Sequence, residues 1–94
     1  IVVEEQEEDA VKDMDIMRVA MYPNPVASLL RVEMPSSADV VIRDASGRYM
    51  MHELWPAGPQ VLDVSAWATG VYTLEATDPL GAWTATPERF VIQR

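Results

Sequence analysis

Hydrophobic and polar residues alternate along most of this chain with the two-residue period of a β-strand. Residues 17–21 show it clearly: Met17, Val19 and Met21 alternate with Arg18 and Ala20, which predicts one buried and one exposed face. The pattern predicts seven short strands, over residues 17–21, 30–34, 40–43, 48–54, 62–65, 72–76 and 89–92. No run shows helical periodicity. Short strands separated by frequent turn signals are typical of a sandwich, so we predict an all-β, seven-stranded antiparallel β-sandwich with an immunoglobulin-like fold.

Turn residues separate these runs. In residues 44–48, Asp44 can accept hydrogen bonds from the backbone that follows it and Gly47 can adopt positive φ, so a tight hairpin should pair the third and fourth strands. Residues 55–59 and 77–81 are rich in Pro and Gly and predict two further turns. Within the fourth strand, Met50 and Met51 should point to opposite faces, which would leave one of them exposed or at a contact.

The charge is concentrated at the start of the chain. The formal net charge is −8, and residues 1–15 hold seven acidic side chains against one lysine, a net −6. Such a segment, with little apolar surface, predicts a flexible acidic linker to an upstream cargo domain, followed by one domain over residues 16–94. The chain begins with Ile1 and has no signal-peptide pattern, which favours a piece of a longer protein.

Composition bears on function mainly by exclusion. The acidic balance and the lack of a basic cluster argue against nucleic-acid binding, and no apolar run approaches the roughly 20 residues of a membrane-spanning helix. The chain has no cysteine and one histidine, His52, which excludes thiolate chemistry and most histidine-based catalytic and metal sites. We therefore expect no enzymatic activity, no cofactor and no metal, with His52 on the surface of a strand.

Three short motifs and the end of the chain together resemble a known family. The motif residues are Tyr22, Pro23, Asn24 and Pro25, then Asp44, Gly47 and Arg48, then Gly70 and Tyr72, and the chain ends in Phe90, Val91, Ile92, Gln93 and Arg94. Each motif alone is ordinary turn chemistry: the prolines predict a stiff bend, and Tyr72 predicts a core aromatic whose hydroxyl needs a partner. In this order, over residues 16–94, they resemble the type A C-terminal sorting domain of the Bacteroidetes type IX (Por) secretion system. Trp67 and Pro87 depart from the family pattern.

The resemblance implies a non-catalytic sorting signal. It implies that the domain directs an attached cargo through the periplasm to the type IX translocon and outer-membrane shuttle and sortase proteins. The sortase then removes it, and the cargo is released or anchored at the cell surface. By the same resemblance, the final residues 90–94 are what the translocon reads. We expect cleavage between Glu8 and Ile16, because a protease needs extended backbone.

Other readings of the same residues remain open. An immunoglobulin-like adhesive or carbohydrate-binding module would give the same strand pattern, and Trp55, Trp67 and Trp83 could form a sugar platform, although packing is the commoner use of tryptophan. A small hydrolase would need a nucleophile next to a general base, and the sequence offers no such pair of residues. The terminal strand is expected to pack Phe90 and Ile92 inward and to offer unpaired backbone groups at its edge, which would suit docking or a strand-exchanged homodimer.

Overall fold

The structure is a computed structural model that describes residues 18–94. The linker expected at residues 1–15 and the cleavage stretch lie outside the described residues. The described part forms seven strands and no helix, and it therefore holds no helical membrane span. The strands are β1 Ala20–Tyr22, β2 Leu29–Met34, β3 Ala38–Asp44, β4 Tyr49–Trp55, β5 Gly58–Asp63, β6 Gly70–Thr77 and β7 Glu88–Ile92.

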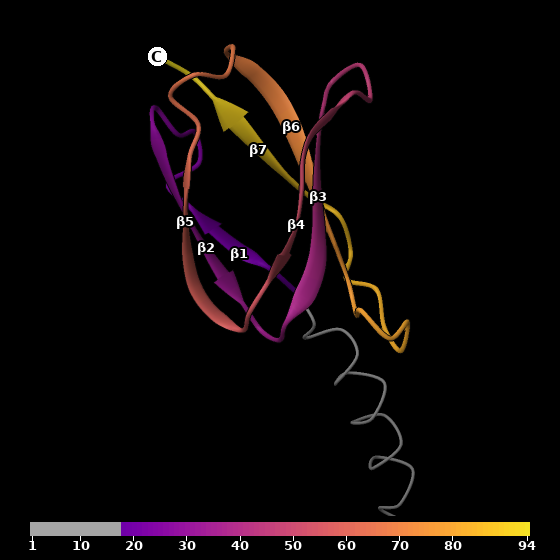
Figure 1. Ribbon diagram of the computed structural model, residues 1–94. Helices are drawn as coiled ribbons and strands as arrows, with labels where there is room; N and C mark the ends of the chain where they lie inside the picture. The colour runs from indigo at the N-terminus through magenta and orange to yellow at the C-terminus, as the bar shows by residue number, and fades with distance from the viewer. Residues whose placement is uncertain (1–17) are drawn as a thin grey trace, which may run out of the picture.

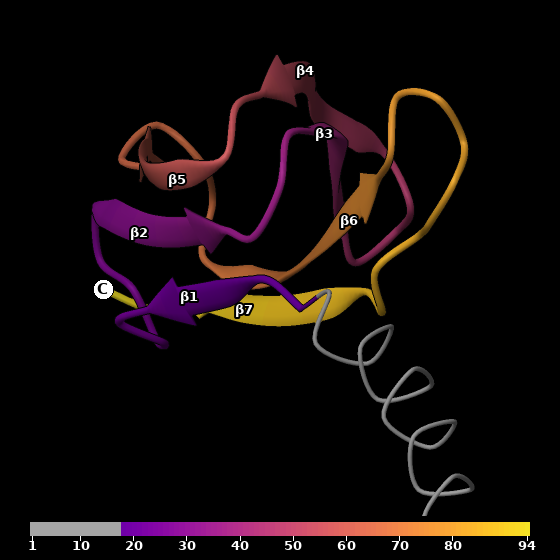
Figure 2. The same cartoon turned by 90° about the horizontal axis from the view of Figure 1, so that it is seen from below.

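Two antiparallel sheets face each other, so the predicted sandwich is confirmed. One sheet has the order β1-β2-β5 and the other the order β4-β3-β6-β7 (Figures 1 and 2). The predicted hairpin pairs β3 with β4, and β6 and β7 pair along their length, with Tyr72 opposite Phe90. As a result β1 and β7 are edge strands of different sheets on the same side of the sandwich, which the view from below shows (Figure 2).

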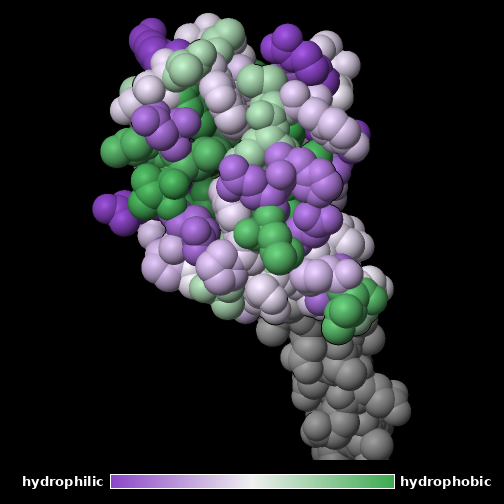
Figure 3. Space-filling model, viewed as in Figure 1, coloured by the Kyte–Doolittle hydropathy of each residue, from purple (hydrophilic) through white to green (hydrophobic). Residues whose placement is uncertain are grey.

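The core lies between the sheets and follows the alternation of the sequence. In β2, Leu30, Val32 and Met34 are buried while Leu29 and Arg31 are exposed. The same two-residue period operates in β3, β6 and β7, because each of these strands turns one face inward and one outward. The side chains with almost no exposed surface are Val26, Leu30, Val32, Val40, Ile42, Val64, Leu74, Phe90 and Ile92. Exposed apolar side chains remain at the surface between polar ones, as the face in Figure 3 shows.

The fifth strand begins four residues earlier than predicted. The sequence predicted a turn over 55–59, but β5 starts at Gly58, and Pro59 pairs with Glu33 of β2. A proline is compatible with this position because β5 is the edge strand of its sheet, so the missing amide donor need not face a neighbour. The inward direction predicted for Leu62 and Val64 holds, since Val64 is buried and Leu62 packs against the core.

The two adjacent methionines of β4 do not divide between the faces, so that expectation was wrong. Met50 and Met51 are both half-buried and both pack against the core. Ile42 pairs with Met51 and Arg43 with Tyr49, so Met50 is the extra residue of a bulge in β4. A bulge inserts one extra residue into a strand and breaks the alternation locally, which lets both side chains turn toward the core.

The two ends of the sandwich differ in what they hold. The bend after β1, the β3–β4 turn, the segment before β6 and the C-terminus lie at one end (Figure 1). The start of β1 and the β6–β7 connection lie at the other end. That connection contains the turn predicted at 77–81, in which the amide of Gly81 donates to the carbonyl of Asp78 at 2.8 Å. The three motifs of the sequence therefore gather toward the C-terminal end of the domain.

Candidate functional site

The C-terminal strand β7 is part of the core. Phe90 is 0% and Ile92 1% exposed. The ring of Phe90 stacks on that of Tyr72, with ring centroids 5.5 Å apart and an interplanar angle of 15°. The prediction that these two side chains face inward is confirmed. Val91 is only half-buried and Gln93 is exposed, so the outward side of the strand is where side chains reach solvent.

The outer edge of β7 is covered by the motif that follows β1. The amide of Val91 donates to the side-chain Oδ1 of Asn24 at 2.9 Å, and Nδ2 of Asn24 donates to the carbonyl of Arg89 at 3.2 Å. The backbone of Val26 continues this contact: its amide donates to the carbonyl of Val91 at 2.8 Å, and its carbonyl accepts from Gln93 at 2.9 Å. The expectation of an unpaired terminal edge is therefore wrong between Arg89 and Gln93. Edge docking or strand exchange through this stretch would first have to displace residues 24–26.

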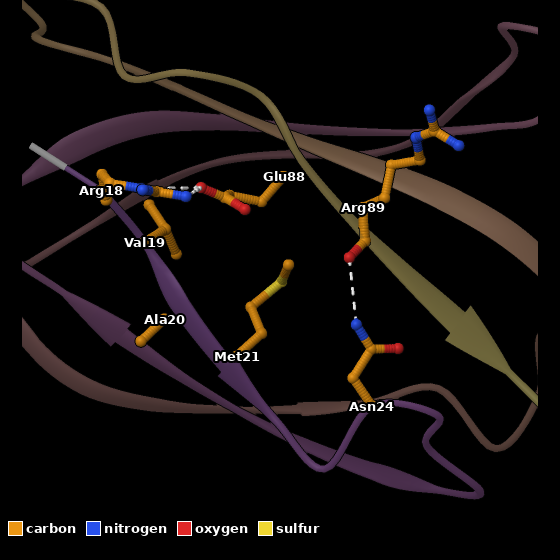
Figure 4. A pocket seen from close by; sticks show the side chains of 7 residues that line it. All are labelled: Arg18, Val19, Ala20, Met21, Asn24, Glu88 and Arg89. Carbon is orange, nitrogen blue, oxygen red and sulfur yellow. Dashed lines mark hydrogen bonds and ion pairs between the residues drawn. The ribbon is translucent and has the colours of Figure 1, made fainter. Parts of the chain in front are cut away.

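A hollow of about 340 Å³ lies between β1 and the start of β7. Arg18 and Glu88 meet at one end of it, with Nη2 and Oε2 3.4 Å apart, and Asn24 reaches the carbonyl of Arg89 at the other (Figure 4). The thioether of Met21 points into the space between these two contacts, whereas the guanidinium of Arg89 points away from it (Figure 4). The hollow thus has an apolar middle and polar ends, and it opens beside the edge that Asn24 covers.

Arg94 joins three carbonyl groups at the C-terminal end of the sandwich. Its Nε donates to Ala27 at 2.9 Å, its Nη1 to Trp67 at 2.8 Å and its Nη2 to Val64 at 2.6 Å. The guanidinium has five donors in a fixed planar arrangement, and here it uses three of them to bridge two loops. The sequence did not reveal this contact, because only the fold brings residues 27, 64 and 67 next to the last residue.

The β3–β4 turn is built around the carboxylate of Asp44. Its Oδ1 accepts hydrogen bonds from the amide and hydroxyl of Ser46 at 2.9 and 2.8 Å and from the amide of Arg48 at 2.9 Å. The hydrogen bond from the Ser46 hydroxyl, followed by that from the Arg48 amide, lowers the pKa of Asp44 below its ordinary value of 3.8. Gly47 has φ 93°, as predicted for the turn. The motif therefore acts as an Asx turn that closes the hairpin.

The motif at the start of β6 meets this turn. Gly70 begins β6, and the buried Tyr72 lies opposite Asp44 across the β3–β6 pair. The Tyr72 hydroxyl was predicted to need a hydrogen-bond partner, and it donates to the carbonyl of Ala68 at 2.6 Å. This resembles the tyrosine corner of immunoglobulin-like sandwiches. Trp67 packs against Tyr72, with ring centroids 5.4 Å apart.

The first motif has a rigid, mostly exposed shape. Pro23, Asn24 and Pro25 form a bend at the surface, as the prolines predicted, and the two peptide bonds before the prolines are cis. Tyr22 lies on the outer face of its sheet, where its hydroxyl donates to Oε2 of Glu33 at 2.9 Å. This hydrogen bond raises the pKa of Tyr22 above 10.0.

The residues with potential for catalysis or metal binding do not gather. Among residues 18–94, no three His, Cys, Asp or Glu side chains lie close enough to hold a metal ion. His52 is exposed on β4, as predicted, with Nε2 2.9 Å from Oδ1 of Asp39. Trp55 is buried, and Trp67 and Trp83 are half-buried against the core. All three tryptophans are thus used in packing.

Comparisons with known proteins agree with this arrangement. Residues 20–93 match the family model described as a secretion system C-terminal sorting domain (Por_Secre_tail). Among solved structures, the chain is similar in fold to PorZ of Porphyromonas gingivalis, an essential bacterial surface component of its type IX secretion system. That match has 22% identity and a TM-score of 0.67, and it covers 85% of this chain and 12% of the PorZ chain. No curated protein matches the chain. At this identity the likeness to PorZ concerns the fold.

Proposed function

The chain belongs to the family of secretion system C-terminal sorting domains, which are non-catalytic and direct the secretion of an attached cargo, and we propose that its cargo leaves through the type IX outer-membrane translocon. The observation that carries the proposal is the family match over residues 20–93, which runs from β1 to the residue after β7. The motifs that suggested type IX secretion all lie within this range. The route would pass through the periplasm and end at the cell surface or in the medium.

We propose further that the translocon contacts the C-terminal end of the sandwich. The bend after β1, the Asp44 turn, the start of β6 and the C-terminus lie together there (Figure 1). The start of β1, where the described part of the chain begins, lies at the opposite end. A cargo joined before Arg18 would thus be attached at the end of the sandwich opposite to the C-terminus.

In and just after β7, the residues that we propose for recognition differ in the direction of their side chains. Phe90 and Ile92 are in the core and have no free surface for a partner in the folded domain. Arg89, Val91 and Gln93 turn their side chains outward. We therefore place the direct contacts of the translocon on the outward set, with the inward set acting through the stability of the strand.

Dependence on the translocon tests the proposed function directly. Residues 1–94 are fused behind a signal peptide and a fluorescent reporter in a Bacteroidetes host, and export is compared with an otherwise identical host lacking the type IX translocon. We expect reporter at the surface or in the medium of the first host only. Equal export from both hosts, or no export from the first although the fused domain is folded, would overturn the proposal.

A paired substitution tests the site without disturbing the core. Replacing Arg89 and Gln93 by Glu changes one exposed side chain in β7 and one directly after it. We expect export to fall at least about tenfold while the melting temperature stays within a few degrees, as is usual for surface changes. Arg31→Glu, on the exposed face of the other sheet, is the matched control and should be exported normally. Similar export by the two variants would contradict direct reading of the outward side of β7.

Sortase cleavage remains part of the proposal. It would fall between Glu8 and Ile16, and the cargo would then be released or anchored. Mass spectrometry of the fragment that contains residues 18–94 gives its first residue. A released fragment that still began at or before Glu8 would count against this position.

A further inference from the structure

Asn24 makes two hydrogen bonds that have the geometry of a missing strand. Val26 pairs with Ile92 in a parallel bridge: the Val26 amide donates to the carbonyl of residue 91, and its carbonyl accepts from residue 93. If this ladder continued two residues back, the backbone of residue 24 would donate to the carbonyl of Arg89 and accept from the amide of Val91. Those two positions are taken by the side-chain Nδ2 and Oδ1 of Asn24.

We infer that the side-chain amide of Asn24 acts as a surrogate peptide group that closes the outer edge of β7 and holds the terminal strand in register. This inference rests on the proposed function only in its consequence for sorting: the Tyr22–Pro25 motif acts in export by positioning β7. Asn24 is thus a positioning residue, and the groups that it positions are Arg89 and Val91.

The chemistry of the side chain explains why an asparagine serves this role. A carboxamide carries one acceptor oxygen and a donor nitrogen, as a peptide group does. Aspartate would keep an acceptor for Val91 but would have no donor for the carbonyl of Arg89. Alanine would lose both contacts and leave the amide of Val91 open at a sheet edge, where unpaired backbone groups invite pairing with another chain.

Arg94, the last residue, holds the end of the chain against the sandwich independently of Asn24. Its guanidinium binds the carbonyls of Ala27, Val64 and Trp67, so the end of the chain stays fastened when Asn24 is changed. Loss of the Asn24 contacts should therefore open β7 locally, near Val91, and leave its inner pairing with β6 intact. This local effect separates the inference from a general loss of stability.

Amide hydrogen exchange of the folded chain of residues 1–94, measured by NMR, tests the positioning. In Asn24→Ala we expect the amide of Val91 to exchange about thirtyfold faster, the factor that two hydrogen bonds of about 1 kcal/mol each represent. The amide of Gln93, which donates to Val26, should change by less than about threefold, on the same reasoning. Ser28→Ala, an exposed change in the same connection, is the control and should leave Val91 unchanged.

A second variant separates the contributions of the two hydrogen bonds that the Asn24 side chain makes. Asn24→Asp retains the acceptor, so the amide of Val91 should stay protected while the contact to the Arg89 carbonyl is lost. Unchanged exchange at Val91 in Asn24→Ala, or an equal rise at all amides of β6 and β7, would overturn the positioning role. The exchange experiment needs no export, so it decides this role even if the proposed function fails.

The export assay then tests the consequence. Asn24→Ala should lower export of the reporter at least about fivefold relative to Ser28→Ala, the factor that one hydrogen bond of about 1 kcal/mol represents. Open exchange at Val91 together with normal export would overturn the link between this contact and sorting. Failure of the unchanged domain to be exported through the translocon would overturn the proposed function and the consequence of Asn24 for sorting. The positioning role of Asn24 would still be decided by the exchange experiment.

Discussion

Replacing Phe90 by Ala should remove a large part of the stability of the domain. Phe90 is fully buried and stacks on Tyr72 between the two sheets. Truncation of a buried phenylalanine to alanine costs about 3–5 kcal/mol, because burial is lost and a cavity remains. A chain of 94 residues has a total stability of about 5–14 kcal/mol at 0.05–0.15 kcal/mol per residue. The variant is therefore expected to be marginally stable, although the residue lies only four positions before the last residue, Arg94.

Urea unfolding followed by tryptophan fluorescence and circular dichroism measures this loss. With a slope near 1 kcal/mol/M, which is usual for a small domain, the midpoint should fall by about 3 M or more. Val91→Ala is the matched control, because it is the next residue of β7 and points outward; it should cost less than about 1 kcal/mol. A loss below about 1.5 kcal/mol in Phe90→Ala, or an equal loss in the two variants, would refute the assignment of β7 to the core.

This prediction decides how deletions of the chain end can be interpreted. Removing residues 90–94 would take out Phe90 and Ile92 and the pairing with β6 together with any recognised surface. Loss of export after such a deletion would follow from unfolding alone. The paired change of Arg89 and Gln93 avoids this, because neither side chain is buried.

Three further predictions concern the other motifs. Tyr72→Phe removes the hydrogen bond to the Ala68 carbonyl and should lower stability by about 1–2 kcal/mol, or several degrees in melting temperature; an unchanged melting temperature would contradict the role of the hydroxyl. Gly47→Ala should lower the free energy of unfolding by about 1–2 kcal/mol, measured by urea unfolding, because positive φ strains any residue with a Cβ. A Cβ at this position would meet no other atom within 4 Å, so backbone strain is the expected cause. The lowered pKa of Asp44 stabilises the fold above about pH 4, and this contribution disappears as pH falls through the lowered pKa. The stability difference between wild type and Asp44→Asn should therefore become smaller in acid. A difference that grew on acidification would show that the Asp44 carboxylate does not stabilise the folded state.

Local patterns in the sequence were sufficient to predict most of the fold. The alternation in β2 and β6 identified their buried faces, and the turn chemistry of Asp44 and Gly47 identified the hairpin between β3 and β4. The need of the Tyr72 hydroxyl for a partner was also clear from the residue type, and a carbonyl four residues earlier meets it. In each of these cases the atoms that interact are close in the chain or belong to one repeating pattern.

The features that the sequence did not predict depend on contacts between distant segments. Asn24 lies 65 residues before Arg89, and Arg94 binds carbonyls in two separate loops, so no local pattern records either contact. The early start of β5 at Gly58 also depends on the fold, because Pro59 is compatible with a strand only at an edge. The sequence analysis assigned no contact to the Asn24 side chain, although a carboxamide can both donate and accept hydrogen bonds.

The contacts of Asn24 with β7 change how the exposed motif Tyr22–Pro25 should be interpreted. The segment Tyr22–Pro25 lies at the surface, which would suit direct contact with a partner, yet its asparagine is already engaged with β7. A substitution there can therefore affect export without touching any contact with the translocon, because it changes the strand that the translocon is proposed to read. Surface exposure of a motif is thus insufficient evidence for direct recognition in this domain. Direct recognition requires a variant that lowers export while the amide of Val91 remains protected.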